Sequence, residues 1–258
     1  MPPRFAMHRW YPTFVKAFIT RWHQRSLAVR SWSSFPAVAA CGTGSVAVVG
    51  NAGYLRNLAQ GHLIDGCDLV IRMNNFEIAG FEPWVGSRVD VFFTNFFTDI
   101  RYERSELGGV KHIVASVPNN FRKARRQQIH HRHSEHLVAG LRAMQRTEVF
   151  VPGWEEFREL VRQWGSFPST GMMAVLFALD FLPCARLYIT GFSFFQGTAH
   201  YFPDQPASAR NHDFFREREL FRTLLAPHLA SGRVVVDPVM QGLLEFPSAL
   251  TSADPQAA

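Results

Sequence analysis

Short runs of apolar, β-branched residues recur along the chain, and longer helical patterns separate the later ones. The run SVAVVG at Ser45–Gly50 is bounded by glycines and predicts a buried strand. Similar runs follow at CDLVIRMNNF, GSRVDVFFTN, VKHIVASVP, ARLYITGFSF and GRVVVDP. The stretches STGMMAVLFALDFL and HDFFRERELFRTLLAPHLA predict helices, the first capped by Ser169 or Thr170. This alternation predicts an α/β fold, a Rossmann-like α/β/α sandwich with a mostly parallel central sheet.

Three polar or glycine positions stand at the ends of predicted strands. Asn51 follows the first strand, Asn74 ends the second, and Gly191 follows a later one. In parallel sheets, ligands bind beyond the carboxyl ends of the strands. We therefore expect these three residues to lie at one edge of the sheet and to line a ligand site.

The chain is long enough for one well-packed domain, with 258 residues of which 47% are hydrophobic. We expect a basic amphipathic segment at 1–35, a single domain at 36–250 and a flexible tail at 251–258. A helix from Trp10 to Trp32 would lie on an anionic membrane or pack on its own domain. No apolar run approaches the roughly 20 residues of a membrane span. We expect a cytoplasmic protein, with a peripheral contact at the inner face of the membrane.

The charge of the chain is positive and comes mostly from arginine. The formal net charge is +6, and all but three of the 27 basic residues are arginine. Arginine binds phosphates and carboxylates, so the bias fits an anionic ligand or surface as well as a general compositional preference. The basic, histidine-rich segment 121–146 is interpreted as a solvated helix face, with contact to an acidic acceptor or a membrane as the alternative. No nucleic-acid partner is expected.

Two short stretches at strand and helix ends could contact a ligand through the backbone. In CGTGSVAVVGNAG, Gly42 and Gly44 precede the strand, so the dinucleotide fingerprint is not matched. The turn at 50–53 still lets the backbone approach a ligand, and Asn51 offers a donor and an acceptor. PSTG at 168–171 enters a helix, where it serves as a cap or as a site for an anion or a nucleotide edge.

Two histidines and a glutamate, His200, His212 and Glu217, lie close together in the sequence. They could form a metal site, an acid/base pair or ordinary packed side chains. Zinc needs a further ligand, and the sequence names no obvious one. A metal-dependent hydrolase, with the histidines of 130–136 as extra ligands, remains one hypothesis.

Taken together, these stretches resemble the four sialyl motifs of the sialyltransferases of glycosyltransferase family 29. The segment VAVVGNAGYLRN, continued by IDGCDLVIRMNNFEIAGFEPWVGSRVDVFF, resembles the large motif. PSTGMMAVLFALDFLPCARLYITGF resembles the small motif, and HYF at 200–202 resembles the third. His212 and Glu217 match the very small motif. All four occur in order.

The resemblance implies a variant GT-A fold and an inverting, metal-independent transfer without a cofactor. A keto-acid sugar, most simply sialic acid, would move from its CMP-activated donor to a hydroxyl of an acceptor glycan or glycolipid. His212 would be the general base, His200 would contact the donor phosphate, and Glu217 would support the helix beyond His212. Implied donor-binding residues are Asn51, Asn74, Ser169, Thr170, Gly171, Gly191, Phe192 and Tyr201. A CMP-Kdo transferase and a catalytically idle CMP-sugar-binding or glycan-binding protein are the alternatives.

The chain departs from the animal members of the family at several positions. Those members join a cysteine of the large motif to one of the small motif. Here Cys184 stands in the small motif, Val46 occupies the aligned position, and Cys41 lies five residues earlier. With Cys67, the three cysteines indicate a reducing compartment. Ala52 replaces a common serine. These departures and the missing anchor suggest a bacterial-type member. Separately, we expect the segment 203–211, between the two histidines, to form a mobile loop over the site.

Overall fold

The computed structural model describes residues 27–42, 44–96, 100–118, 128–194, 200–202 and 212–245, with the backbone alone for 128–135. The expected N-terminal helix up to residue 26, the loop 203–211 and the tail 251–258 lie outside the described residues. The histidine side chains of 130–133 lie outside them as well.

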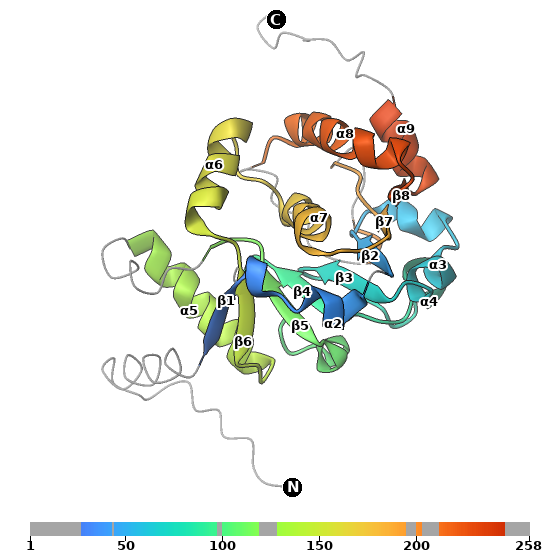
Figure 1. The fold of residues 1–258 in the computed structure, drawn as a ribbon. Helices are drawn as coiled ribbons and strands as arrows, with labels where there is room; N and C mark the ends of the chain where they lie inside the picture. Colours follow the sequence, from blue (N-terminus) through green and yellow to red (C-terminus); the bar gives the residue numbers. More distant parts are fainter. Residues whose placement is uncertain are drawn as a thin grey trace, which may run out of the picture.

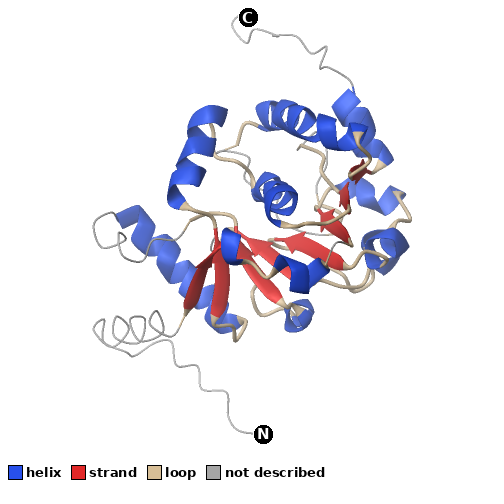
Figure 2. Ribbon diagram, viewed as in Figure 1, coloured by secondary structure: helices blue, strands red, loops and turns tan. Residues whose placement is uncertain are grey.

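Eight strands form one sheet in the order β1-β6-β5-β4-β3-β2-β7-β8. Each described strand pair is parallel, and the sheet runs through the middle of the molecule (Figures 1 and 2). The strands are β1 (Ala28–Ser31), β2 (Ser45–Val49), β3 (Leu69–Met73), β4 (Val91–Thr94), β5 (His112–Ala115), β6 (Glu148–Val151), β7 (Arg186–Thr190) and β8 (Val234–Val236). The predicted α/β fold with a parallel central sheet is confirmed.

Helices cover both faces of the sheet. They are α2 (Ala37–Cys41), α3 (Gly61–Asp65), α4 (Glu82–Val85), α5 (Gln128–Ala143), α6 (Trp154–Trp164), α7 (Thr170–Phe181), α8 (Phe214–Ala230) and α9 (Pro238–Glu245), with 3-10 turns η1 (Trp32–Ser34), η2 (Gly53–Asn57) and η3 (Ser105–Gly109). Helix α7 contacts β2, β3, β4 and β7, and in Figure 1 it lies between the sheet and the outer helices α6 and α8. It is apolar on nearly every side because it is covered on nearly every side.

Strand β2 shows why the central strands are almost continuously apolar. Val46 and Val48 face the core under α7, whereas Ala47 and Val49 face a second core with Ile64 of α3. Successive side chains of a strand point to opposite faces, and here both faces are buried. After Ser45, the run SVAVVG therefore has no polar position until the strand ends at the site.

The end of the expected N-terminal helix is a strand instead. Ala28–Ser31 forms β1, which pairs with β6 in the register Val29 to Val149. Trp32 and Phe35 then enter the core, and the Trp32 indole donates to the carbonyl of Ala115 at 3.2 Å. The backbone of this short stretch gains its hydrogen bonds from the open edge of β6, a partner that no local pattern reveals. The helix therefore does not reach Trp32.

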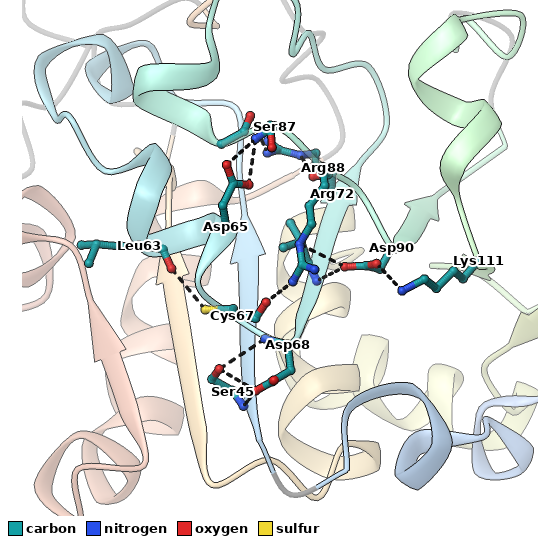
Figure 3. Close-up of polar contacts among 12 residues, drawn as sticks. Ser45, Leu63, Asp65, Cys67, Asp68, Arg72, Ser87, Arg88, Asp90 and Lys111 are labelled. Carbon is teal, nitrogen blue, oxygen red and sulfur yellow. Dashed lines mark hydrogen bonds and ion pairs between the residues drawn. The ribbon is translucent and has the colours of Figure 1, made fainter.

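Charged side chains fasten the amino-terminal edge of the sheet (Figure 3). Asp68 accepts from the backbone N–H of Ser45 at 2.7 Å, and Asp90 accepts from Val70 N–H at 2.9 Å. Lys111 forms an ion pair with Asp90 at 2.8 Å. These contacts hold β2, β3, β4 and β5 in register at one edge, and the opposite edge carries the candidate site.

Arg72 of β3 is fully buried on the face opposite α7. Its Nε donates to the carbonyl of Arg88 at 2.9 Å, and an Nη2 hydrogen bond reaches Gly86 at 3.3 Å. Burial lowers the pKa of Arg72 to about 10. The side chain ties the end of α4 to β3, so the strand that carries Asn74 is held from its own buried face.

Candidate functional site

Two glycines meet between β2 and β7, at the switch point where the order of successive strands in the sheet reverses. Gly191 leaves β7 with φ +82°, and a Cβ built on it would lie 2.8 Å from the carbonyl oxygen of Gly50. A Cβ on Gly50 would lie 2.2 Å from the carbonyl oxygen of Gly191. Only glycine fits both positions. The two turns are thus packed backbone to backbone at the switch point, where α/β folds bind ligands.

The two asparagines expected in the site connect neighbouring strand ends. Asn51 Nδ2 donates to the carbonyl of Asn75 at 2.7 Å, which joins the end of β2 to the end of β3. Asn74 adopts a left-handed conformation with φ 50°, and its Nδ2 donates to Thr170 Oγ1 at 3.2 Å. Its Oδ1 accepts from Asn95 N–H at 3.3 Å. The structure therefore brings Asn74 to the first residue of α7 and ties Asn51 to the end of β3.

The start of α7 lies against the turn after β7. Ser169 is the N-cap, and its Oγ accepts from Met172 N–H at 3.1 Å. A Cβ on Gly171 would lie 2.7 Å from the ring of Phe192, so glycine allows that ring to cover the first helical turn. Phe192 is buried and packs on Phe221 of α8, with ring centroids 5.5 Å apart. Its side chain contributes packing beneath the site.

The third motif is attached to the end of β2. His200 pairs with Ala52 in an antiparallel bridge, and Tyr201 N–H donates to the carbonyl of Asn51 at 3.1 Å. The Tyr201 phenol accepts from Glu77 N–H at 3.0 Å and donates to the Glu77 carbonyl at 2.5 Å. Burial raises the pKa of Tyr201 to about 12. The buried phenol is engaged by the protein. His200 is half-buried and lies beside Asn51.

The ring of His212 is held by a single carbonyl oxygen. Its Nδ1 lies 2.8 Å from the carbonyl oxygen of Phe167. A carbonyl only accepts, so Nδ1 carries the proton and Nε2 of the neutral ring is an acceptor. His212 precedes α8, which is capped by Asp213 accepting from Arg216 N–H at 3.0 Å. This tautomer is the one that a general base needs.

Glu217 connects α8 to the start of α7. Its Oε2 accepts from Ser169 N–H at 2.8 Å, and its Oε1 accepts from Ser169 Oγ at 2.5 Å. Burial raises the pKa of Glu217, while the bonds from Ser169 and the nearby His212 act in the opposite direction. Within the described ranges, no group of three His, Cys, Asp or Glu side chains is arranged to hold a metal. Because Ser169 engages both oxygens of Glu217, a metal grouping with His200 and His212 is not formed.

Arg104 is a site residue that the sequence did not single out. It donates to the carbonyl of Asn74 at 2.8 Å and to that of Phe76 at 2.5 Å. Its guanidinium carbon lies 4.3 Å from the centroid of the Phe76 ring. Burial lowers the pKa of Arg104 to about 10. It fixes the left-handed turn at Asn74, yet it lies in a segment without any motif.

Tyr54 and Asp237 were also missed. The Tyr54 hydroxyl donates to Asp237 Oδ2 at 2.7 Å, directly behind Gly191. Two sequence signals could have found them: Tyr54 lies three residues after Asn51, and Asp237 directly follows the last strand.

The three cysteines are buried free thiols. Burial, followed by the charges of Cys184 and Asp68, raises the pKa of Cys41 to about 11. The disulfide that animal relatives make between their motifs is not formed here.

Comparison with known proteins decides the family. A family model described as glycosyltransferase family 29 (sialyltransferase) matches residues 39–229, well over half of the chain. The chain belongs to glycosyltransferase family 29. It is 26% identical over 217 residues to the CMP-N-acetylneuraminate-beta-1,4-galactoside alpha-2,3-sialyltransferase of Rattus norvegicus, covering 74% of this chain but only 56% of the rat protein. It thus spans little more than half the length of that family 29 relative.

Two further similarities are informative, one to a solved structure and one to a plant protein. A crystal structure of a mammalian sialyltransferase superimposes with a TM-score of 0.59 at 21% identity, covering 89% of this chain and 81% of that one; this match shows a shared fold. The beta-1,6-galactosyltransferase GALT29A of Arabidopsis thaliana is 49% identical over 51 residues, covering 20% of this chain and 13% of the plant protein. None of the described helices has the length and apolarity of a membrane span.

Proposed function

We propose that this chain is an inverting glycosyltransferase that moves a keto-acid sugar, sialic acid first, from a CMP-activated donor to a hydroxyl of an acceptor glycan or glycolipid. The observation that carries the proposal is the hydrogen bond from His212 Nδ1 to Phe167, which leaves Nε2 as a base beside the capped start of α7. The names of the mammalian relatives support a CMP-linked donor.

His212 removes the proton of the attacking acceptor hydroxyl. As the oxygen bonds to the anomeric carbon, Nε2 takes the proton and the ring becomes an imidazolium. The hydrogen bond from Nδ1 to the Phe167 carbonyl keeps the ring in place. The orientation of the ring is thus set by the backbone carbonyl of Phe167.

CMP departs from the opposite side of the anomeric carbon and takes the bonding electron pair onto its phosphate. His200, attached beside Asn51, stabilises that negative charge by donating a hydrogen bond. The N–H groups at the start of α7 also favour an anion. A phosphate monoester is a good leaving group, so the proposed reaction requires no divalent cation.

Exposed aromatic rings next to His212 suit a sugar acceptor. Phe167 is 56% exposed and Phe215 is 55% exposed. The backbone carbonyl of Phe167 holds the ring of His212, and Phe215 lies three residues after His212 as the second residue of α8. We place this reaction in the cytoplasm, with the N-terminal segment in contact with an anionic membrane.

A donor and acceptor screen followed by mass spectrometry tests the proposal. CMP-sialic acid, CMP-Kdo and UDP-galactose are each offered with a panel of glycans, with and without EDTA. We expect release of CMP and a gain in acceptor mass of one sialic acid, unchanged by EDTA. Transfer from CMP-Kdo alone would identify the other donor, and CMP binding without transfer would indicate a binding protein. Transfer from UDP-galactose alone, as the name of the plant relative suggests, would contradict the proposal.

A further inference from the structure

The turn after β7 is held from behind by a tyrosine and an aspartate. Tyr54 belongs to η2, which follows β2, and its hydroxyl accepts from the N–H groups of Gly191 and Phe192, both at 3.0 Å. The same hydroxyl donates to Asp237 Oδ2 at 2.7 Å. One phenol oxygen thus joins Asp237 to the backbone of the turn.

Asp237 is the centre of this network and is 1% exposed. Its Oδ2 also accepts from Thr190 Oγ1 at 2.8 Å and from Gly191 N–H at 3.2 Å. Its Oδ1 accepts from Met240 N–H at 2.8 Å, which caps α9. No cation pairs with Asp237 in the part of the chain that the structure describes, so these donors compensate its charge. Burial, and next the charge of Asp237, raise the pKa of Tyr54, so the phenol keeps its proton and remains a donor.

The turn needs these acceptors because of its backbone conformation. With φ +82° at Gly191, two successive N–H groups point into the protein instead of continuing the sheet. Buried N–H groups without acceptors are costly. Tyr54 and Asp237 supply the acceptors and thereby hold the turn in this conformation.

Because the turn at Gly191 is held in place, the segments next to it on the ligand side are held in place as well. The carbonyl of Gly191 accepts from Ala52 N–H at 3.0 Å, which positions the turn that carries Asn51. The ring of Phe192 packs against Gly171 at the start of α7. A displacement of the turn would therefore move parts of both the large and the small motif.

We propose that Tyr54 and Asp237 are positioning residues for the donor nucleotide. This inference rests on the proposed function, because it assumes that the turn at Gly191 lies under the CMP moiety. Neither side chain is a catalytic residue. They act through the backbone of Gly191 and Phe192, and they set the affinity for the nucleotide rather than the chemistry of transfer.

A pair of tyrosine variants tests this role. Tyr54→Phe removes the hydroxyl that holds the turn. Tyr188→Phe is the matched control, because its hydroxyl is also in the protein interior but donates to Gln60 Oε1 at 2.6 Å instead of accepting from the N–H groups of Gly191 and Phe192. The dissociation constant of CMP is measured by isothermal titration calorimetry, and folding is followed by the melting temperature.

We expect the melting temperatures of both variants to fall below that of the wild type by a similar amount. Only Tyr54→Phe should weaken CMP binding, by roughly fivefold to tenfold, as expected for a buried network hydrogen bond. Tyr188→Phe should stay within about twofold of the wild type. Asp237→Asn, which keeps the shape but loses acceptor capacity, should raise the KM for the donor and leave the KM for the acceptor unchanged.

Three results would overturn the inference, and they differ from failure of the proposed function. Equal CMP affinity of Tyr54→Phe and the wild type would overturn it. Equal weakening in Tyr54→Phe and Tyr188→Phe would also do so, because the effect would then follow stability alone. The third is an Asp237→Asn protein whose donor and acceptor KM values rise together. Absence of CMP binding by the wild type would instead reject the proposed function, and the positioning role with it.

Discussion

The close backbone approach of Gly191 and Gly50 can be tested with single substitutions. Gly191→Ala adds a Cβ at φ +82°, 2.8 Å from the carbonyl oxygen of Gly50. Gly232 is the control, because it has a similar φ of +74° but nothing within 4 Å of the added Cβ. We expect Gly232→Ala to lose about 1 kcal/mol in the free energy of unfolding, from the backbone strain alone.

We expect Gly191→Ala to lose at least about 2 kcal/mol, since the backbone contact adds to the strain. Denaturant unfolding of the two variants gives the comparison. Equal losses would show that the close approach of the two turns does not limit the site.

The support that Arg104 gives to the Asn74 turn can be tested by comparison with Arg101, an exposed arginine on the same segment. Arg104→Lys keeps the charge but loses the planar group that reaches the carbonyls of both Asn74 and Phe76. We expect a loss of about 2 kcal/mol in the free energy of unfolding. Arg101→Lys, which disturbs only an exposed ion pair with Glu77, should lose less than about 0.5 kcal/mol. Similar losses in the two variants would remove Arg104 from the support of the Asn74 turn.

At the residue scale, the sequence could predict positions but not the contacts behind them. The end of a parallel strand is a defined place, so Asn51, Asn74 and Gly191 could be assigned to one edge in advance. Tyr54 and Asp237 meet across 183 positions of the chain. That contact depends on β8 lying next to β7, and no local pattern encodes the order of the strands.

At the scale of elements, Glu217 joins α8 to α7 through Ser169. Burial raises its pKa in the folded protein above the ordinary value of 4.5. The folded state therefore binds this proton more tightly than the unfolded state. The stabilisation from this group is complete below about pH 4.5 and is lost as the pH rises through the folded pKa.

Glu217→Gln removes this titration, so the wild type should lose stability relative to Glu217→Gln as the pH rises above about 4.5. Denaturant unfolding of both proteins across that range measures the difference. A difference that stays constant, or that changes in favour of the wild type as the pH rises, would contradict the burial of an ionisable group at this junction.

The elements differ in how far their sequences determine them. Helix α7 and strand β2 are almost entirely apolar because both are covered on nearly all sides, and such runs are recognisable without a structure. Strand β1 is short, carries Arg30, and forms only because β6 offers an open edge. The expected helix there followed local amphipathicity, and the strand follows tertiary pairing, which overrides local preference.

At the scale of the whole molecule, the core encloses all three thiols. Burial raises the pKa values of Cys41, Cys67 and Cys184, that of Cys41 to about 11. The native protein should therefore react very slowly with iodoacetamide at about pH 8, because thiolates are the reactive form. Denaturation without reductant should expose all three thiols to titration. Rapid native labelling, or one titratable thiol after denaturation, would contradict the free, buried state of the cysteines.

The central claim is that His212 acts as the general base of a transfer from a CMP-linked donor. The most direct measurement is the rate of CMP release from CMP-sialic acid with acceptor present, for the wild type, for His212→Asn and for the exposed His62→Asn on α3. We predict that His212→Asn lowers the rate by about 100-fold to 10,000-fold while binding CMP like the wild type. His62→Asn should match the wild type. An unchanged rate of CMP release by His212→Asn would contradict the account.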